Sequence, residues 1–132
     1  MGYYSNVKIM CEEKAFEKLK EIFLDETKCI MPDRVYRLPE LYNAYSMEWN
    51  DLKWYDDPKY FPGVYEIMRS LDNFERLDIE EDGWGFNFTR IGEEFGDVEI
   101  IETTNDFYFD VITEIRNSFK TEDISLEIMK EK

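Results

Sequence analysis

The first part of the chain changes its hydrophobic period once. From Tyr3 to Cys11, apolar and polar residues alternate as in a half-buried β-strand, with Val7 and Ile9 on the same side as Cys11. The next segment, Glu12 to Glu26, spaces its apolar residues like one face of a helix, at Ala15, Phe16, Leu19, Ile22 and Phe23. The pattern therefore predicts a strand followed at once by an amphipathic helix.

The middle of the chain predicts two more strands and a second helix. Arg34 to Leu38 is a short strand candidate between two prolines, and the aromatic-rich run from Met47 to Tyr55 alternates as a strand does. Pro62 then stands where the first turn of a helix tolerates proline, and apolar residues recur every three or four positions from Val64 to Leu71. We expect a helix from Pro62 to Asn73.

The remaining residues predict antiparallel β-structure. Glu75 to Glu81 and Gly85 to Ile91 are expected to form a hairpin around the turn signal Asp82-Gly83. Val98 to Thr103 and Phe107 to Ile115 are expected to form a second pair, although the latter segment also fits a helical spacing. The chain then ends in a short helix or a frayed tail.

Length and element order together predict the fold class. A chain of 132 residues and 16.0 kDa corresponds to one domain. Two helices are too few to cover both faces of a parallel sheet. We therefore expect an α+β fold, an antiparallel or mixed β-sheet with two helices packed on one face in a ferredoxin-like β-α-β-α-β-β arrangement. Residues 1–120 would form this single domain, and residues 121–132 a C-terminal tail.

Composition removes several classes of function. The chain has 31 acidic and 16 basic residues, a net charge of −15, and no histidine. Such a protein is repelled by nucleic acid and by anionic membranes. Without histidine it lacks Ser-His-Asp and Cys-His catalysis and every imidazole metal site. With no apolar run that could span a bilayer and no secretory signal, we expect a cytoplasmic protein with two reduced cysteines.

Two weaker chemical patterns point to metal or acid–base chemistry. Acids at Asp78, Glu80 and Asp82, followed by Gly83, match the front half of an EF-hand loop, but Thr89 stands where the bidentate glutamate belongs. Paired carboxylates could act as an acid and a base, but they would need a concave pocket to do so. We therefore expect no metal, no cofactor and no enzymatic activity.

The negative charge is concentrated in the second part of the chain. Residues 61–132 carry a net charge of −12, and the 25 residues from Asp78 to Glu102 carry −8. If the predicted strands are adjacent, these acids form one extended anionic surface, with Trp84 as an apolar anchor. An acidic surface that only keeps a small protein in solution would explain the same charge. The candidate partner-binding residues are Asp78, Glu80, Glu81, Asp82, Trp84, Glu93, Glu94, Asp97 and Glu99.

Several segments also carry a resemblance. The opening MGYYSNVKI, the central WNDLKWY followed by PGVYEI, and the block TRIGEEFGDVE look like small uncharacterised proteins carried by phages and prophages. The resemblance covers most of residues 1–102. It implies a host-takeover or counter-defence factor in the host-cell cytoplasm, a class that includes anti-CRISPR proteins, some of which occupy the nucleic-acid channel of a nuclease.

These observations lead to two functional hypotheses. In the first, a non-enzymatic acidic protein inhibits a host nuclease or effector by presenting carboxylates to its basic nucleic-acid-binding groove, with no direct contact to nucleic acid or membrane. In the second, an immunity-type or regulatory protein binds another basic partner, such as a toxin nuclease. A phage or helix-turn-helix regulator gene beside this one would favour the first hypothesis, and a toxin gene the second.

Charge reversal tests the anionic surface. Reversing Glu93, Glu94, Asp97 and Glu99 together is expected to abolish binding to a basic partner, because it replaces attraction with repulsion, while leaving the fold intact. Binding can be measured by calorimetry and folding by circular dichroism. Unchanged affinity in the reversed variant would assign the charge to solubility alone.

Overall fold

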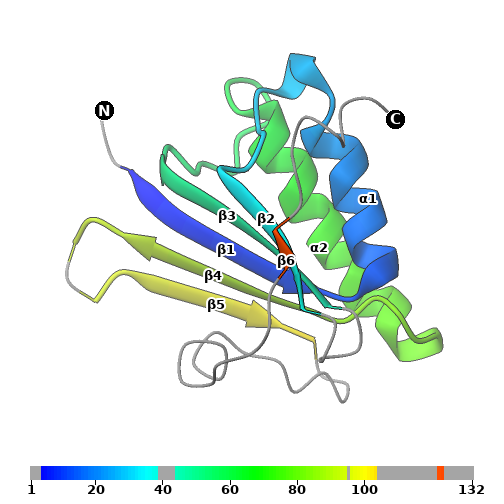
Figure 1. Cartoon of the computed structure of the whole chain (residues 1–132). Coiled ribbons are helices and arrows are strands. Elements are labelled where there is room, and N and C mark those ends of the chain that lie inside the picture. Colours follow the sequence, from blue (N-terminus) through cyan, green and yellow to red (C-terminus); the bar gives the residue numbers. More distant parts are fainter. Residues whose placement is uncertain (1–3, 39–43, 95, 104–121, 124–132) are drawn as a thin grey trace.

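The computed structural model describes residues 4–38, 44–94, 96–103 and 122–123. These residues form an antiparallel six-stranded sheet with strand order β5-β4-β1-β3-β2-β6, and two α-helices (Figure 1). The elements in chain order are β1 (Ser5–Cys11), α1 (Glu13–Phe23), the 3₁₀ turn η1 (Glu26–Lys28), β2 (Arg34–Leu38), β3 (Ala44–Leu52), α2 (Pro62–Glu80), β4 (Phe86–Gly92), β5 (Val98–Glu102) and β6 (Glu122–Asp123).

Both helices lie against one face of the sheet, which confirms the predicted α+β class (Figure 1). From β1 to β4 the elements follow one another along the chain as β-α-β-β-α-β. The two strands that lie between the helices in sequence, β2 and β3, pair with each other. The strands expected at Arg34–Leu38 and Met47–Tyr55 are both present, as β2 and, with shifted bounds, as β3. The predicted order β-α-β-α-β-β counted only one strand there and is not exact, and β5 and β6 extend the sheet further. The arrangement is therefore a split βαβ unit with added strands rather than the predicted series.

The second helix is seven residues longer than the sequence pattern predicted, and the predicted strand Glu75–Glu81 is wrong. Phe74 is buried and Leu77 packs against the core, so the two continue the apolar stripe of Ile67 and Leu71 to the end of α2. The turn signal at Asp82-Gly83 therefore follows a helix. Gly83 has a φ of 106°, a conformation that residues with a side chain rarely adopt, so the chain needs glycine where it leaves α2.

The strands of the second half pair differently from the prediction. The strand predicted from Gly85 to Ile91 is β4, which pairs with β1 on one side and β5 on the other. The segment Phe107–Ile115, expected to pair with β5, lies outside the described residues. Of the predicted tail, Glu122–Asp123 pairs with β2 as β6, and the rest is outside the described part, so the division at residue 120 stays a prediction.

The core lies between the helices and the inner face of the sheet. Ile9 of β1, Leu19 of α1 and Ile67 of α2 are fully buried there, as is Phe88 of β4. Trp49 of β3 packs against Trp54 with their ring centroids 5.3 Å apart. Its indole N–H donates a hydrogen bond of 2.8 Å to the carbonyl oxygen of Ile30, which ties the loop before β2 to the sheet. None of the described helices is long and apolar enough to cross a membrane.

Replacement of the two core tryptophans tests this tie. Trp49→Phe leaves the buried Ile30 carbonyl without its donor, so we expect a loss of about 2 kcal/mol in the free energy of unfolding, measured in urea. Trp54→Phe is the matched control, because the indole N–H of Trp54 is buried and has no hydrogen-bond partner among the residues that the structure describes. We expect a smaller loss for Trp54→Phe, and an equal or larger one would contradict the assigned role of Trp49.

Candidate acidic interaction surfaces

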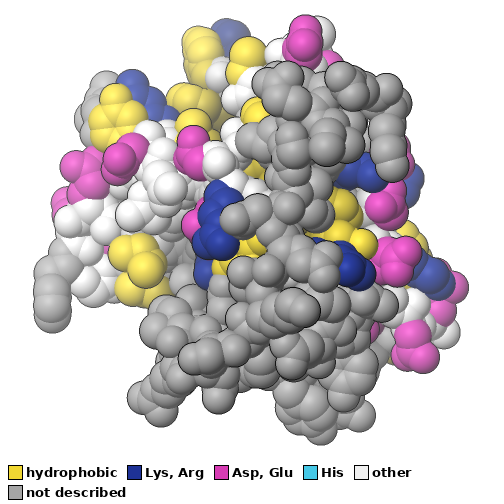
Figure 2. Space-filling view, viewed as in Figure 1, with side chains coloured by type: hydrophobic (Ala, Val, Ile, Leu, Met, Phe, Trp, Pro, Cys, Tyr) yellow, Lys and Arg dark blue, Asp and Glu magenta, His cyan; other side chains and the backbone are white. Residues whose placement is uncertain are grey.

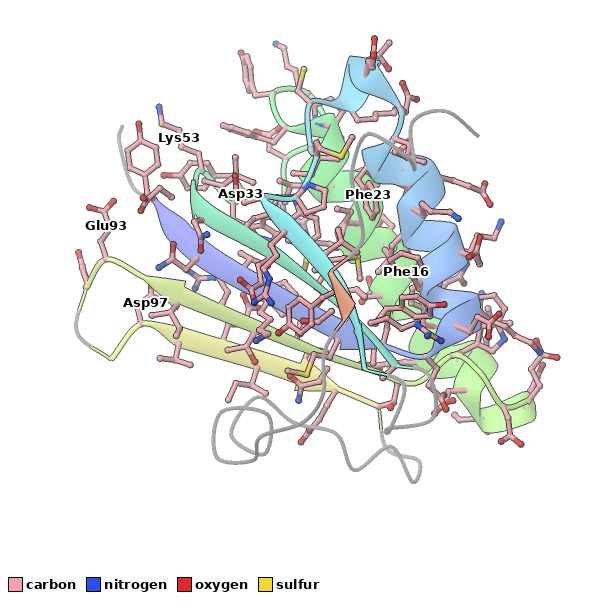
Figure 3. All side chains as sticks on the ribbon, in the orientation of Figure 1. Phe16, Phe23, Asp33, Lys53, Glu93 and Asp97 are labelled. Atoms are coloured by element: carbon pink, nitrogen blue, oxygen red, sulfur yellow. The ribbon has the colours of Figure 1, made fainter. Side chains whose placement is uncertain are left out.

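The candidate partner-binding residues do not form one continuous surface. One group lies at the end of α2 and in the loop before β4, and the other lies at the turn between β4 and β5. These two places are at opposite ends of β4, a strand of seven residues. At about 3.4 Å per residue, the groups are roughly 20 Å apart. Figure 3 shows Glu93 and Asp97 of the second group at the far end of the β4–β5 hairpin from α2.

Trp84 organises the first group. Its ring packs against Phe74 of α2 with the centroids 5.3 Å apart, and its indole N–H donates a 2.6 Å hydrogen bond to Oε1 of Glu81. The same carboxylate oxygen is 3.6 Å from Nζ of Lys14 on α1. The hydrogen bond from Trp84, followed by the charge of Lys14, holds the pKa of Glu81 below its ordinary value of 4.5. Glu81 therefore stays ionised and links α1 to the loop.

The other acids of the first group differ in exposure. Asp78 is only 7% exposed, so its side chain belongs to the helix–sheet interior and not to an outer surface. Glu80 is exposed on the last turn of α2, and Asp82 is exposed in the loop that follows. Only Glu80, Glu81 and Asp82 of this group therefore offer carboxylates to a partner.

A groove along α1 joins this loop. It has a volume of about 770 Å³, and we call it the α1 acidic groove. Its lining is formed by Glu12, Glu13, Lys14, Glu17, Lys18, Glu21, Asp82, Gly83 and Trp84. Five of these side chains are carboxylates and two are lysines, so the groove is anionic around a half-buried tryptophan. Figure 2 shows acidic side chains on the α1 side of the molecule as well as at its opposite end.

A reciprocal pair of hydrogen bonds holds the two walls of the α1 acidic groove together. The backbone N–H of Glu12 donates to the carbonyl oxygen of Gly85 at 2.9 Å. In return, the backbone N–H of Gly85 donates to Oε2 of Glu12 at 2.8 Å. The start of α1 is thereby fixed to the start of β4, which places Asp82 and Trp84 beside the helix.

The α1 residues of this groove were not among the candidates that the sequence predicted. Glu13, Glu17 and Glu21 are exposed and follow one another at intervals of four residues, which places them on one face of α1. Their spacing predicts a row of acids on one face of a helix. The row is not visible in the distribution of net charge, because it lies in the half of the chain where acids and bases nearly balance. Glu17 pairs with Lys20 at 3.1 Å, whereas Glu13 and Glu21 form no ion pair within the described part of the chain.

The second group is partly neutralised by Arg90. The side chain of this β4 arginine is only 16% exposed, and its guanidinium lies 2.8 Å from Asp97 and 3.2 Å from Glu99. It also donates to Oγ of Ser5 at 3.1 Å. The hydrogen bonds that Arg90 donates to the Asp97 carboxylate are the main cause that raises the pKa of Arg90 above its ordinary value. Asp97 and Glu99 thus form a structural clamp on a largely buried cation.

The two remaining acids of the second group lie in the turn itself. Glu93 is exposed, and its carboxylate accepts a hydrogen bond from the backbone N–H of Tyr4, which directly precedes β1. Glu94 is exposed beside it. The expectation that all four acids of this turn can be reversed without harm to the fold therefore needs correction. Reversing Asp97 and Glu99 would place new cations against the arginine that they now hold.

No protein-family model, curated protein or solved structure matches this chain. The resemblance to phage proteins and the inhibitory role that it implies therefore stay predictions. No group of three or more histidine, cysteine or acidic side chains among the described residues is placed to hold a metal ion. The α1 acidic groove therefore offers a partner negative charge, an aromatic ring and hydrogen-bond acceptors.

A pair of double variants separates the structural acids from the surface acids. Asp97→Asn with Glu99→Gln leaves the Arg90 guanidinium without its counter-charges, so we expect a loss of about 2 kcal/mol, between the values for exposed and buried pairs. Glu93→Gln with Glu94→Gln removes the same amount of charge from the same turn but keeps both counter-charges of Arg90, and an amide oxygen at position 93 can still accept the hydrogen bond from Tyr4, so we expect a smaller loss. Urea unfolding measures both. Equal losses in the two variants would contradict the clamp.

Proposed function

We propose that this protein binds a basic protein surface without catalysing a reaction, and that the α1 acidic groove is the part that docks. The observation that carries the proposal is the composition of the groove, in which five carboxylates and two lysines surround Trp84. Glu80 and Glu81 extend the negative charge beyond it. We further propose that the partner is a host nuclease or effector, and that docking blocks its nucleic-acid-binding groove.

The spacing of the carboxylates on α1 supports mimicry of a phosphate backbone. Glu13, Glu17 and Glu21 are four residues apart, so they advance by about 6 Å each along the helix axis. Phosphates of one DNA strand advance by about 3.4 Å, so every second phosphate advances by about 7 Å. A row of lysine or arginine side chains that binds alternate phosphates would therefore find carboxylates at similar intervals.

Trp84 supplies a contact that charge alone does not give. Its N–H is already bound to Glu81 and one part of its ring packs on Phe74, so its orientation is held before a partner arrives. The remaining indole surface lines the groove. An arginine or lysine from a partner could stack on this ring while it pairs with a neighbouring carboxylate. Such a preorganised aromatic anchor is typical of protein interfaces.

Neutral isosteres on α1 test the proposal. The wild-type protein first retains partners from an extract of its natural host at low salt, and each candidate is then purified and measured alone. We expect Glu13→Gln, Glu17→Gln and Glu21→Gln together to weaken binding about tenfold, because exposed ion pairs contribute up to about 1 kcal/mol each. Binding of the wild type should weaken as salt rises, and it should be excluded by bound DNA or RNA.

The matched control removes charge from the other end of the molecule. Glu93→Gln with Glu94→Gln should leave the affinity within about twofold, since these acids lie roughly 20 Å from the α1 acidic groove. Salt-independent binding, or equal losses in the two sets of variants, would refute docking through the groove. A complex that forms equally well on a nuclease with its nucleic acid already bound would refute mimicry and favour an immunity-type protein.

A further inference from the structure

A second pocket lies away from the α1 acidic groove, where the end of β3 meets the start of α2. It has a volume of about 530 Å³, which falls within the range of about 300–1,000 Å³ typical of small-molecule sites. Its lining comes from four parts of the chain: the residue before β1, the turn η1 with the residues that follow it, the end of β3, and the start of α2. We call it the α2 pocket.

The walls of the α2 pocket are fixed by tertiary contacts. Gly63 lets α2 approach the loop before β2 so closely that a Cβ there would lie 2.7 Å from the Lys28 carbonyl oxygen and 2.8 Å from Cβ of Ile30. The Ile30 carbonyl is held by the indole of Trp49, and Lys28 pairs with Glu66 of α2 at 2.9 Å. The cavity is therefore preformed, which lowers the entropic cost of binding a ligand.

The α2 pocket is lined by backbone in a strained, left-handed conformation. Cys29, with a φ of 52°, and Asp51, with a φ of 53°, are the two described non-glycine residues with positive φ, and both line it. Left-handed conformations at such residues cost energy and cluster at ligand-binding and active sites. The two strained residues therefore support a ligand-binding role for the α2 pocket, but they do not indicate which ligand binds.

The charge and the aromatic rim of the α2 pocket indicate the ligand class. Its lining has two lysines and one acid, whereas the chain as a whole has about twice as many acids as bases. Lys28 is already paired, but Lys53 forms no ion pair within the described residues, and its Nζ lies 5.6 Å from the centre of the Tyr4 ring. Figure 3 shows Lys53 projecting at this end of the sheet. Tyr4 and Tyr60 are 41% and 68% exposed, so two aromatic rings stand at the rim.

We propose that the α2 pocket binds a small aromatic molecule that carries one anionic group. The ring of the ligand packs against the apolar lining and the tyrosine rim, and the anion pairs with Lys53. The first turn of α2, which has no side-chain cap, adds a favourable potential for the anion. This role is independent of docking at the α1 acidic groove, so either one can fail without the other.

Two fluorescent probes that differ in charge test the proposal on the full chain. One is 8-anilinonaphthalene-1-sulfonate, an aromatic anion, and the other is N-phenyl-1-naphthylamine, its neutral counterpart. We expect saturable binding of the anion with one site per chain. Lys53→Gln should weaken the anion about tenfold and the neutral probe less than twofold, since only the anion loses a charged partner. Tyr60→Ala should weaken both probes, because it removes an exposed part of the rim.

Arg76→Gln is the matched control for charge. It changes the net charge of the protein as Lys53→Gln does, but Arg76 is exposed on α2 and lines neither the α2 pocket nor the α1 acidic groove, so both affinities should stay within about twofold. Thermal unfolding of each variant checks the fold. Loss of anion binding to the same extent in Arg76→Gln and Lys53→Gln would overturn the proposal, as would an absence of saturable binding to the wild type.

Cys29 reports where the probe sits. It is exposed and lines the α2 pocket, whereas Cys11 is buried, and burial raises the pKa of the Cys11 thiol, so iodoacetamide should modify Cys29 alone. Saturating anilinonaphthalene sulfonate is expected to slow this alkylation at least about fivefold in the wild type and to have a much smaller effect in Lys53→Gln at the same probe concentration. An unchanged alkylation rate with the probe bound to the wild type would place the probe elsewhere and overturn the assignment.

Discussion

The position of β1 between β3 and β4 is the constraint on which the rest of the structure depends. This strand forms antiparallel ladders on both sides, and its last residue, Cys11, stands opposite Tyr45 of β3 and Phe86 of β4. Because α1 starts two residues later, the register of β1 also decides where the helix begins relative to β4. The hydrogen bonds between Glu12 and Gly85 complete that connection. Both walls of the α1 acidic groove thus derive from one strand register.

The same register gives similar acidic residues different physical roles. At one end of β4, Asp97 and Glu99 surround the guanidinium of Arg90, so much of their charge is used within the molecule. At the other end, Glu13 and Glu21 of α1 lie beside Asp82 around a fixed tryptophan. Carboxylates held by a largely buried cation have little charge left for a partner. Carboxylates that form no ion pair within the described part of the chain and lie around an aromatic ring are suited to a basic partner. Charge density along the sequence does not distinguish these two cases.

Hydrophobic spacing predicted much of the fold correctly, and its main failure has a simple cause. The first strand, the first helix and the α+β class follow from the spacing of apolar residues within single segments of the chain. The end of α2 was mispredicted because Glu75 to Glu81 contains few apolar residues, and a short stretch of this kind fits a strand or a helix equally well. The segment is helical because a helix lets Phe74 join the core and Leu77 pack against it, and this packing is a tertiary contact. Asp78 then falls on the buried side and leaves the predicted surface.

The sequence by itself determined the net charge of −15, the absence of histidine and the amphipathic periods that produce a layered α+β domain. These depend on composition and on local spacing, which no folding event changes. Tertiary structure alone decided which acids face solvent, which hold Arg90, and which residues meet around Trp84. It also brought Tyr4, Cys29, Lys53 and Tyr60 to one pocket. Such sites join residues far apart in the chain, so their geometry comes from strand pairing and core packing, which no local pattern encodes.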